Sequence, residues 1–493
     1  MIAANLPALQ VVLPLLGAVL CAFLQRGVWA WGIALVVSVA MPFVAAGLLI
    51  QVLDGGIISY AMGGWEPPIG IEYRIDVVNA FLLLLVSVIG AVIMPYAKRS
   101  VEKEIAPEHQ PWFYAIYLLC LCGLLGIVIT GDAFNVFVFM EVSSLATYAL
   151  IAMGRDRRAL LAAYQYLIMG TIGATFYVIG VGLLYSMTGT LNLADMANRL
   201  EGIENSRAVL AALAFLTVGI SLKLALFPLH VWLPNAYTYA PSMATAFLAA
   251  TATKVAVYLL LRYFFTVFGA SIIFTRLPVA EIFLILSLAA MFGASIVAVF
   301  QDNVKRMLAY SSVAQIGYIT LGIAIANKTG LTGGIVHLFN HALIKGALFM
   351  AIGAVFYQIG SVKLDDLAGL GKRMPITMGA FVMAGLSIIG VPGTVGFVSK
   401  WYLGLGAFEQ GWWWLVFLLV ASSLISVVYI GRIVEVVWFR PVSAAAKRAK
   451  EPPLSMLLPT LLLVAATVYF GFDTSLTAGI AERAAEWLLA GIR

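Results

Sequence analysis

Cysteine is scarce in this sequence, with three among 493 residues. Cys120 and Cys122 lie two positions apart in an apolar stretch and Cys21 stands alone, so no set of four has the spacing of a zinc or iron–sulfur site. Nucleotide-binding motifs and redox ligands are also missing from the sequence. We therefore expect no metal, no cofactor and no catalytic chemistry of the chain's own.

Charged residues are also scarce, at 11% of the chain, whereas 63% of the residues are hydrophobic and the mean hydropathy is +1.02. Apolar runs of about 20 residues recur along the whole sequence, which excludes a soluble globular protein. The net charge of +6 does not indicate a nucleic-acid partner, because the basic residues lie mostly between these runs. No basic residue precedes the first apolar run, so we expect no cleavable signal peptide.

The apolar runs predict an all-α polytopic membrane protein with about 14 transmembrane helices, in a single membrane domain of residues 1–493. The expected spans are 5–24, 28–52, 76–97, 111–130, 133–153, 159–187, 208–234, 241–267, 278–299, 307–327, 331–358, 375–407, 411–431 and 453–471. Residues 54–74 are too polar and too rich in glycine and proline to span, and we expect a short hairpin at the membrane surface. Residues 472–493 carry Leu476, Trp487 and other apolar residues at helical spacing, which predicts an amphipathic helix in the interface.

Basic residues are divided unequally between the two sides of the predicted membrane segments. Of the 29 Lys and Arg residues, 17 lie in one set of alternate connections and eight lie in the opposite set and the tails. Because positively charged connections stay in the cytoplasm, we expect the first set inside and both termini outside. The eight are Arg74, Arg199, Arg207, Arg262, Arg276, Lys328, Arg483 and Arg493. The remaining four, which lie within spans, are Lys223, Lys254, Lys345 and Lys400.

The stretch 211–261 holds two of these lysines beside a predicted helix break. Pro228 and Pro234 interrupt the first helix, because proline removes a backbone donor and clashes one turn back. Lys223 lies in that helix and Lys254 in the next. A lysine at the bilayer centre costs about 2.5–3.5 kcal/mol on insertion scales, so this pair indicates an internal ion or proton path. The alternative, that each lysine reaches to the interface, is opposed by more than one turn of apolar residues on both sides.

A second predicted break lies in the twelfth span, where Gly390, Pro392, Gly393 and Gly396 cluster and Lys400 follows. Interrupted helices in both halves of a chain are typical of transporters built from inverted repeats. Breaks in the seventh and twelfth spans therefore predict this architecture.

Glu141 lies near the middle of the fifth span, where an unpaired carboxylate would be neutralised by protonation. Lys223 is its expected partner. The alternative is a structural ion pair that only holds two helices together. Asp132 begins the same helix and is either an accessory proton-transfer residue or a helix cap.

His337, His341 and Lys345 follow one another at four-residue spacing, which places them on one face of a helix. A neutral imidazole accepts a proton on one nitrogen and donates one from the other near neutral pH, so these residues form a predicted proton wire. Metal binding by the two histidines is the alternative, but no nearby carboxylate or cysteine completes a ligand set. His230, beside Pro228, is a further accessory candidate.

Five segments together resemble the antiporter-like proton channel family. That family includes the D-type protein of Mrp-type multisubunit cation/proton antiporters and the large membrane-arm subunits of complex I and of membrane-bound hydrogenases. The segments, within residues 131–401, are GDAFNVFVFMEVSSLATYAL, LKLALFPLHVWLPNAYTYAPS, KRMLAYSSVAQIGY, HLFNHALIKG and GVPGTVGFVSKW. The resemblance implies two inverted five-helix repeats, at 111–267 and 278–431. It also implies a hydrophilic axis through Glu141, Lys223, Lys254, His337, His341, Lys345 and Lys400.

The resemblance implies a proton-translocating subunit of a multisubunit monovalent cation (Na+)/proton antiporter. Its expected surroundings are other membrane subunits and the lipid bilayer of a prokaryotic cell membrane. The final axis position is acidic in several complex I relatives, so Lys400 fits the Mrp D-type better. One alternative is a proton-pumping subunit of a complex I-like NADH:quinone oxidoreductase or of a membrane-bound hydrogenase. The other is a scaffold without transport, which the intact charged residues argue against.

Proton movement is expected to depend on the charge of Lys223. Lys223 stays protonated beside Glu141, and burial favours its neutral form when the pair opens. That preference amounts to about 4 kcal/mol for a buried lysine. Moving one charge through 100 mV costs about 2.3 kcal/mol, so the two energies are of matching size.

Overall fold

A computed structural model describes residues 3–490 of the chain. Twelve of its helices are long and apolar enough to cross a membrane, and two shorter apolar helices, Leu6–Ala22 and Pro375–Ile389, bring the number of crossings to fourteen in this part of the chain. The predicted fold class, an all-α polytopic membrane protein, is confirmed. In chain order the crossings are α1 (Leu6–Ala22), α2 (Gly27–Gly55), α3 (Val77–Glu104), α4 (Gln110–Ile129), α5 (Ala133–Ala152), α6 (Arg158–Thr188), α8 (Arg207–Leu224) with α9 (Trp232–Tyr239), α10 (Ser242–Leu261), α11 (Val279–Ala289) with α12 (Ser295–Val299), α13 (Val304–Ile325), α14 (Lys328–Ile359), α15 (Pro375–Ile389) with α16 (Val395–Glu409), α17 (Trp413–Val434), and α18 (Leu454–Phe472) with α19 (Ser475–Ala490).

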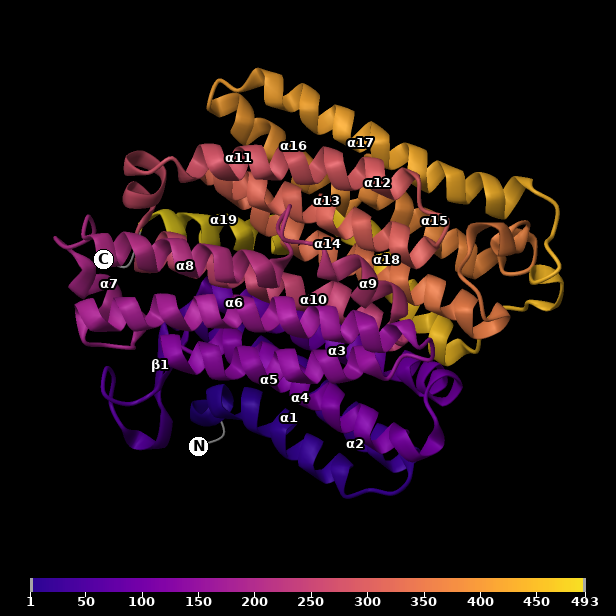
Figure 1. Cartoon of the computed structure of the whole chain (residues 1–493), viewed down its shortest axis with the longest axis horizontal. Coiled ribbons are helices and arrows are strands. Elements are labelled where there is room, and N and C mark those ends of the chain that lie inside the picture. The colour runs from indigo at the N-terminus through magenta and orange to yellow at the C-terminus, as the bar shows by residue number, and fades with distance from the viewer. Residues whose placement is uncertain (1–2, 491–493) are drawn as a thin grey trace.

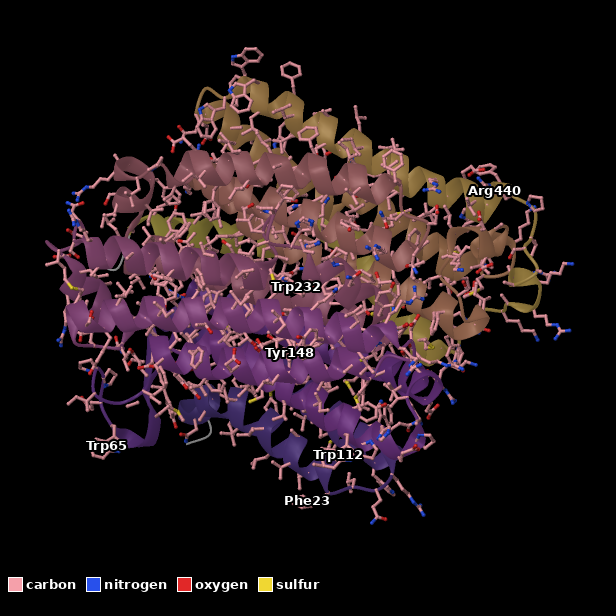
Figure 2. All side chains as sticks on the ribbon, in the orientation of Figure 1. Phe23, Trp65, Trp112, Tyr148, Trp232 and Arg440 are labelled. Carbon is pink, nitrogen blue, oxygen red and sulfur yellow. The ribbon has the colours of Figure 1, made fainter. Side chains whose placement is uncertain are left out.

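The helices run side by side in one bundle, with α1 to α5 along one edge and α17 along the other (Figure 1). α10, α13 and α14 lie within the bundle, and most of their residues are buried. Trp65 and Arg440 lie at opposite ends of the bundle, and Tyr148 and Trp232 lie near its middle (Figure 2). Four residues of the predicted axis, Lys254, His337, His341 and Lys345, therefore belong to the best-packed part of the molecule.

Both predicted helix breaks are present. Residues 225–231 separate α8 from α9, and residues 390–394 separate α15 from α16, where Gly390 has a φ of 92° that favours glycine. Pro228 lies in the first break, as predicted. Pro234 does not break the helix, because it lies in the first turn of α9, where a missing backbone N–H costs little.

Two similar backbone joints support the predicted inverted repeats. Asp132 caps α5 and bridges to Asn192, whereas Asn303 caps α13 and bridges to Lys363. The first joint links the start of α5 to the segment after α6, and the second links the start of α13 to the segment after α14. The first joint precedes the fifth crossing and the second precedes the tenth, so the joints lie at opposite ends of the bundle. The repeat boundaries given above stay predictions.

Outside the crossings, the expected surface hairpin consists of β1 (Ile58–Ala61) and β2 (Glu72–Ile75), which pair antiparallel. A short helix, α7 (Leu193–Leu200), follows α6. The C-terminal helix α19 (Ser475–Ala490) is present, but its position differs from the prediction. Rather than lying flat in the interface, it follows α18 along the bundle and packs against α14 and α3, because its apolar face meets those helices (Figure 1). Residues 491–493 lie outside the described residues.

We expect cysteines introduced into 98–110 and 441–452 to react with a membrane-impermeant maleimide only after the membrane is opened. These segments lie in the connections that carry the excess of positive charge, which stay on the cytoplasmic side. A cysteine at Gly202, in the connection between α7 and α8, should react in intact cells. The three native cysteines are buried, so they give little background labelling. Labelling of residues 98–110 and 441–452 in intact cells would show that the topology is the reverse of the predicted one.

Candidate functional site

The basic residues of the predicted axis lie in the break-flanking helices α8 and α16 and in the buried helices α10 and α14, whereas Glu141 lies in α5. Lys223 lies in the last turn of α8, Lys254 is in α10, and Lys400 is in α16. The sequence spacing of His337, His341 and Lys345 is realised on one continuous helix, α14. The exposed fractions are 7% for Lys223, 0% for Lys254, 1% for His337, 0% for His341 and 0% for Lys345. Five basic groups so deeply buried are costly unless they have a function or a partner.

The predicted Glu141–Lys223 pair is present but long. Lys223 Nζ lies 3.9 Å from Glu141 Oε1, whereas it donates to Ser144 Oγ at 2.6 Å and to Tyr148 Oη at 3.5 Å. Glu141 Oε1 is buried and accepts no hydrogen bond from residues 3–490. The ammonium group is thus held by a neutral hydroxyl one turn along α5 from the carboxylate. The sequence indicates these partners, because Ser144 and Tyr148 lie three and seven positions after Glu141 and so share its face of the helix.

An aromatic stack joins this pair to the first helix break. Tyr148 packs edge-on against Tyr166, and Tyr166 stacks on Trp232 with ring centroids 3.7 Å apart. Trp232 Nε1 donates to the carbonyl of Leu222, beside Lys223. These rings fix the end of α8, and with it the position of the Lys223 side chain.

Lys254 lies in α10 with neutral partners. Its Nζ donates to the carbonyl of Ala249 and, at 3.3 Å, to Thr253 Oγ1. It interacts electrostatically with His341 and Lys345 of α14, which packs against α10. The helix that carries Lys254 therefore packs against both α8, which holds Lys223, and α14.

The two histidines of α14 have different surroundings. His337 is held at both ring nitrogens, with Nδ1 2.8 Å from Ser399 Oγ and Nε2 2.9 Å from Gln315 Oε1. His341 stacks against it at 6.2 Å between ring centroids, and neither of its ring nitrogens has a hydrogen-bond partner within residues 3–490. The contact with Ser399 was not predicted. Because Ser399 directly precedes Lys400 in the chain, it links His337 to the helix that carries Lys400.

Lys345 completes this face of α14. Its Nζ donates to the carbonyl of Leu308 at 2.8 Å and to Ser311 Oγ. Ser311, like Gln315, belongs to α13, whose polar stretch the sequence shows clearly. The lysine is therefore held by neutral oxygens, as Lys254 is.

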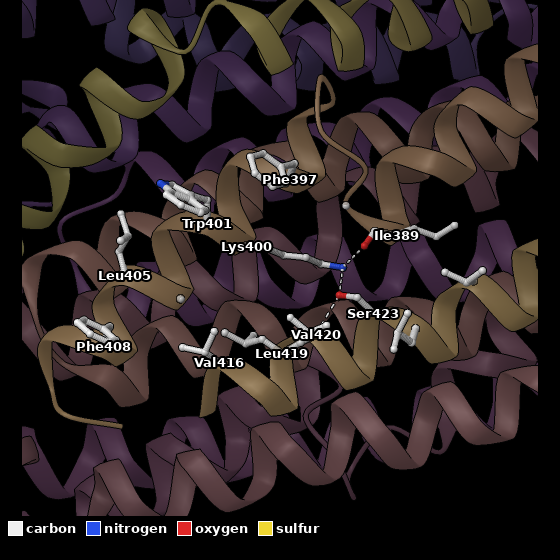
Figure 3. Close-up of a pocket in the computed structure, with 14 residues that line it drawn as sticks. Ile389, Phe397, Lys400, Trp401, Leu405, Phe408, Val416, Leu419, Val420 and Ser423 are labelled. Carbon is white, nitrogen blue, oxygen red and sulfur yellow. Dashed lines mark hydrogen bonds between the residues drawn. The ribbon is translucent and has the colours of Figure 1, made fainter. Parts of the chain in front are cut away.

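Lys400 lies at the second helix break and at the base of an apolar cavity of about 480 Å³ between α16 and α17 (Figure 3). Its Nζ donates to the carbonyls of Ile388 at 3.1 Å and Ile389 at 2.8 Å, and to Ser423 Oγ at 2.8 Å. The two carbonyls are at the end of α15, where the break leaves them without helical donors. A cation is favoured there because a helix C-terminus carries partial negative charge. The ring of Tyr318 lies 4.6 Å from the same ammonium.

The two accessory candidates occupy different places. His230 is in the first break, stacks on Phe227 and has no hydrogen-bond partner for Nδ1 among the described residues. Asp132 is 9% exposed and accepts a hydrogen bond from the backbone N–H of Asn135, so it caps α5. It is nine residues from Glu141, or about 13 Å along the helix. The structure does not bring it to the axis.

Residues 130–426 match the protein family described as "NADH:quinone oxidoreductase/Mrp antiporter, TM". The chain belongs to this family. It is 42% identical to an N-type subunit of NADH-quinone oxidoreductase from Desulforudis audaxviator, over 99% of each chain. It is 30% identical to a D-type subunit of the Na(+)/H(+) antiporter from Bacillus subtilis, over 98% of this chain and 97% of the relative. The predicted family resemblance is confirmed.

Solved structures of the Mrp antiporter and complex I-like family share the fold over almost the whole chain. A chain of the Mrp complex from Dietzia sp. DQ12-45-1b superimposes with a TM-score of 0.90 at 26% identity, covering 99% of this chain and 98% of that one. A chain of the membrane-bound sulfane sulfur reductase, an archaeal respiratory membrane complex, gives a TM-score of 0.89 at 30% identity, covering 100% and 98%. The chain is thus a multi-pass membrane subunit of this family.

Proposed function

We propose that this chain translocates protons along a buried lysine–histidine axis, as a membrane subunit of a multisubunit monovalent cation (Na+)/proton antiporter in a prokaryotic cell membrane. The row of buried basic groups carries the proposal. Apart from Lys223, these groups form no ion pair within residues 3–490, so each of them can hold or release its proton without breaking one. Glu141 is the only carboxylate that pairs with an axis residue within residues 3–490.

Helix packing and hydrogen bonds support the following order for the axis. Lys223 and Glu141 lie at the first break, and Lys254 connects them to His341 and Lys345. His337 leads to the second break through Ser399, next to Lys400. The Lys223–Glu141 distance of 3.9 Å leaves room for the ammonium to move between the carboxylate and Ser144. We infer that this movement changes the charge of Lys223 and drives protons onward.

The antiporter proposal is supported by the 30% identity to the D-type Na(+)/H(+) antiporter protein and by Lys400 at the final axis position. A second candidate is a proton-pumping subunit of a redox-driven complex. The 42% identity to the N-type protein of NADH-quinone oxidoreductase favours that candidate. Both candidates use the same axis and differ in the subunits that would supply the driving force.

Purification from native membranes under mild conditions separates the two candidates. We expect the tagged chain to copurify with other small hydrophobic membrane subunits and to support sodium-dependent proton exchange in liposomes. Iron–sulfur or flavin subunits in the purified assembly, together with redox-driven proton uptake, would instead establish the second candidate. If the purified assembly showed neither sodium-dependent exchange nor redox-driven proton uptake, the scaffold alternative would be favoured.

The chain purified alone is expected to show little or no sodium-driven proton flux. The amino group of Lys400 lies beside an apolar cavity at the lateral surface, and this face needs a neighbour to complete an aqueous exit. Flux should be measured with a pH-sensitive dye in liposomes, with the whole assembly at equal amounts of this chain as the control. Rapid sodium/proton exchange by the chain alone would contradict this prediction.

A further inference from the structure

One side of α18, together with the first turn of α19, presents a stripe of exposed apolar residues. Leu458, Leu462, Tyr469, Phe472 and Leu476 are between 45% and 77% exposed. The spacing of Leu458, Leu462, Tyr469 and Phe472 places these four on one face of α18, and Leu476 follows in the first turn of α19. Beside the inner half of this stripe, α3 and α18 enclose a groove of about 720 Å³. Lipid chains alone could cover a purely apolar face of this kind.

Asp473 interrupts the stripe with an exposed carboxylate. Its Oδ1 accepts hydrogen bonds from the backbone N–H of Ser475 at 3.1 Å and from Ser475 Oγ at 2.6 Å. Its Oδ2 accepts one from Tyr469 Oη at 3.0 Å. These bonds shape the turn between α18 and α19 and leave the outer side of the carboxylate open.

The α18–α19 turn lies near the middle of the membrane. A Cβ atom built on Gly471 would lie 2.6 Å from the carbonyl oxygen of Gly393, so the turn abuts the second helix break. That break divides the twelfth crossing into two helices of 15 residues each. Each half is about 22 Å long at 1.5 Å per residue, which places the break, and Asp473 with it, close to the midplane.

A carboxylate at this depth is costly when it faces lipid. Placing Asp at the centre of a membrane helix costs about 2.5–3.5 kcal/mol on insertion scales, and hydrocarbon offers no hydrogen-bond donor. A neighbouring protein helix can offer one. Polar side chains that bond across helices are used in this way within membranes, where small residues allow close approach.

We propose that the α18–α19 face binds a transmembrane helix of another subunit, which places a hydrogen-bond donor side chain opposite Asp473. The expected helix is apolar toward the groove between α3 and α18 and carries Ser, Thr, Asn, Gln or Lys at mid-membrane depth. This interface rests on the proposed function only in requiring a multisubunit assembly. None of its residues lines the cavity at Lys400, which lies between α16 and α17.

Photo-cross-linking within the intact assembly tests the interface. A benzophenone amino acid is placed at Phe472 or at Leu476, and the complex is irradiated in native membranes, purified and analysed by mass spectrometry. We expect both positions to form adducts with the same transmembrane segment of one other subunit. Asp473→Ser, which keeps a turn-forming residue, should lower both yields by about three- to twentyfold.

Ser475→Ala is the matched control, because it removes a hydrogen bond within the turn and leaves the carboxylate. It should leave both yields unchanged. Adducts with lipid only, or with a second copy of this chain, would overturn the proposal. Equal loss of yield in Ser475→Ala and Asp473→Ser would also overturn it, since the turn and not the carboxylate would then matter. Proton flux of the same purified assembly shows separately whether the proposed function holds.

Discussion

Lys400→Ala is expected to abolish most proton translocation, with a loss of about hundredfold or more. Alanine removes the only cation at the end of α15 among the described residues and leaves the carbonyls of Ile388 and Ile389 without their donor. No titratable side chain then remains at this position to bind and release the proton. Proton flux should be measured in equal amounts of assembled complex.

Lys345→Ala should be less severe, with a loss of about tenfold or less. Lys345 is one station of a row in which Lys254 and His341 lie close by, so the proton has a neighbouring route. Lys400→Glu should keep part of the activity, because a protonated carboxyl can still donate to one of the carbonyls at the break. Lys328→Ala is the matched control, since Lys328 forms an exposed ion pair with Glu486 at the surface and should be dispensable. An inactive Lys345→Ala beside an active Lys400→Ala would show that the exit lies on α14.

Glu141→Gln is expected to abolish proton-coupled transport while the complex still assembles. Glutamine keeps the volume of the side chain but cannot hold Lys223 in its charged form. We expect a loss of flux of about hundredfold or more, which corresponds to about 2.7 kcal/mol or more in the barrier to proton transfer. Lys223→Ala should have the same effect, measured as sodium-dependent proton flux.

Two controls separate the charge from the surrounding contacts. Ser144→Ala removes the 2.6 Å hydrogen bond to Lys223 and should lower flux less than Glu141→Gln, because Glu141 remains to stabilise the charged form. Glu102→Gln breaks an exposed ion pair with Arg99 and should leave flux unchanged. Near-normal transport by assembled Glu141→Gln would refute a charge switch at Lys223.

The features predicted correctly from the sequence are those with a local physical cause. Apolar length marks the crossings, proline and glycine mark the breaks at Pro228 and Gly390, and helical spacing puts His337 and Lys345 on one face. The roles of these residues in proton transfer stay predictions. They concern chemistry that the fold alone does not test.

Contacts between distant helices could not be predicted in this way. Ser399 binds His337 only because α14 and α16 are neighbours. Arg262 was counted as a charge of an outer connection, but it is 6% exposed and pairs with Asp76 at 2.8 Å, beneath the ring of Trp487. The packing of α19 against α14 and α3 was not predicted either. Each case depends on which helices meet, and no single segment encodes that.

The two backbone joints that begin α5 and α13 bear on how the chain is made. Positions 132 and 192 are sixty apart, and so are 303 and 363. Each joint therefore closes within a short stretch of chain that leaves the ribosome well before synthesis ends. Because the entropic cost of closing a loop grows only slowly with its length, the first joint can close before any residue of the second has been synthesised. The order of synthesis thus favours one half of the bundle as a finished template on which the other half docks.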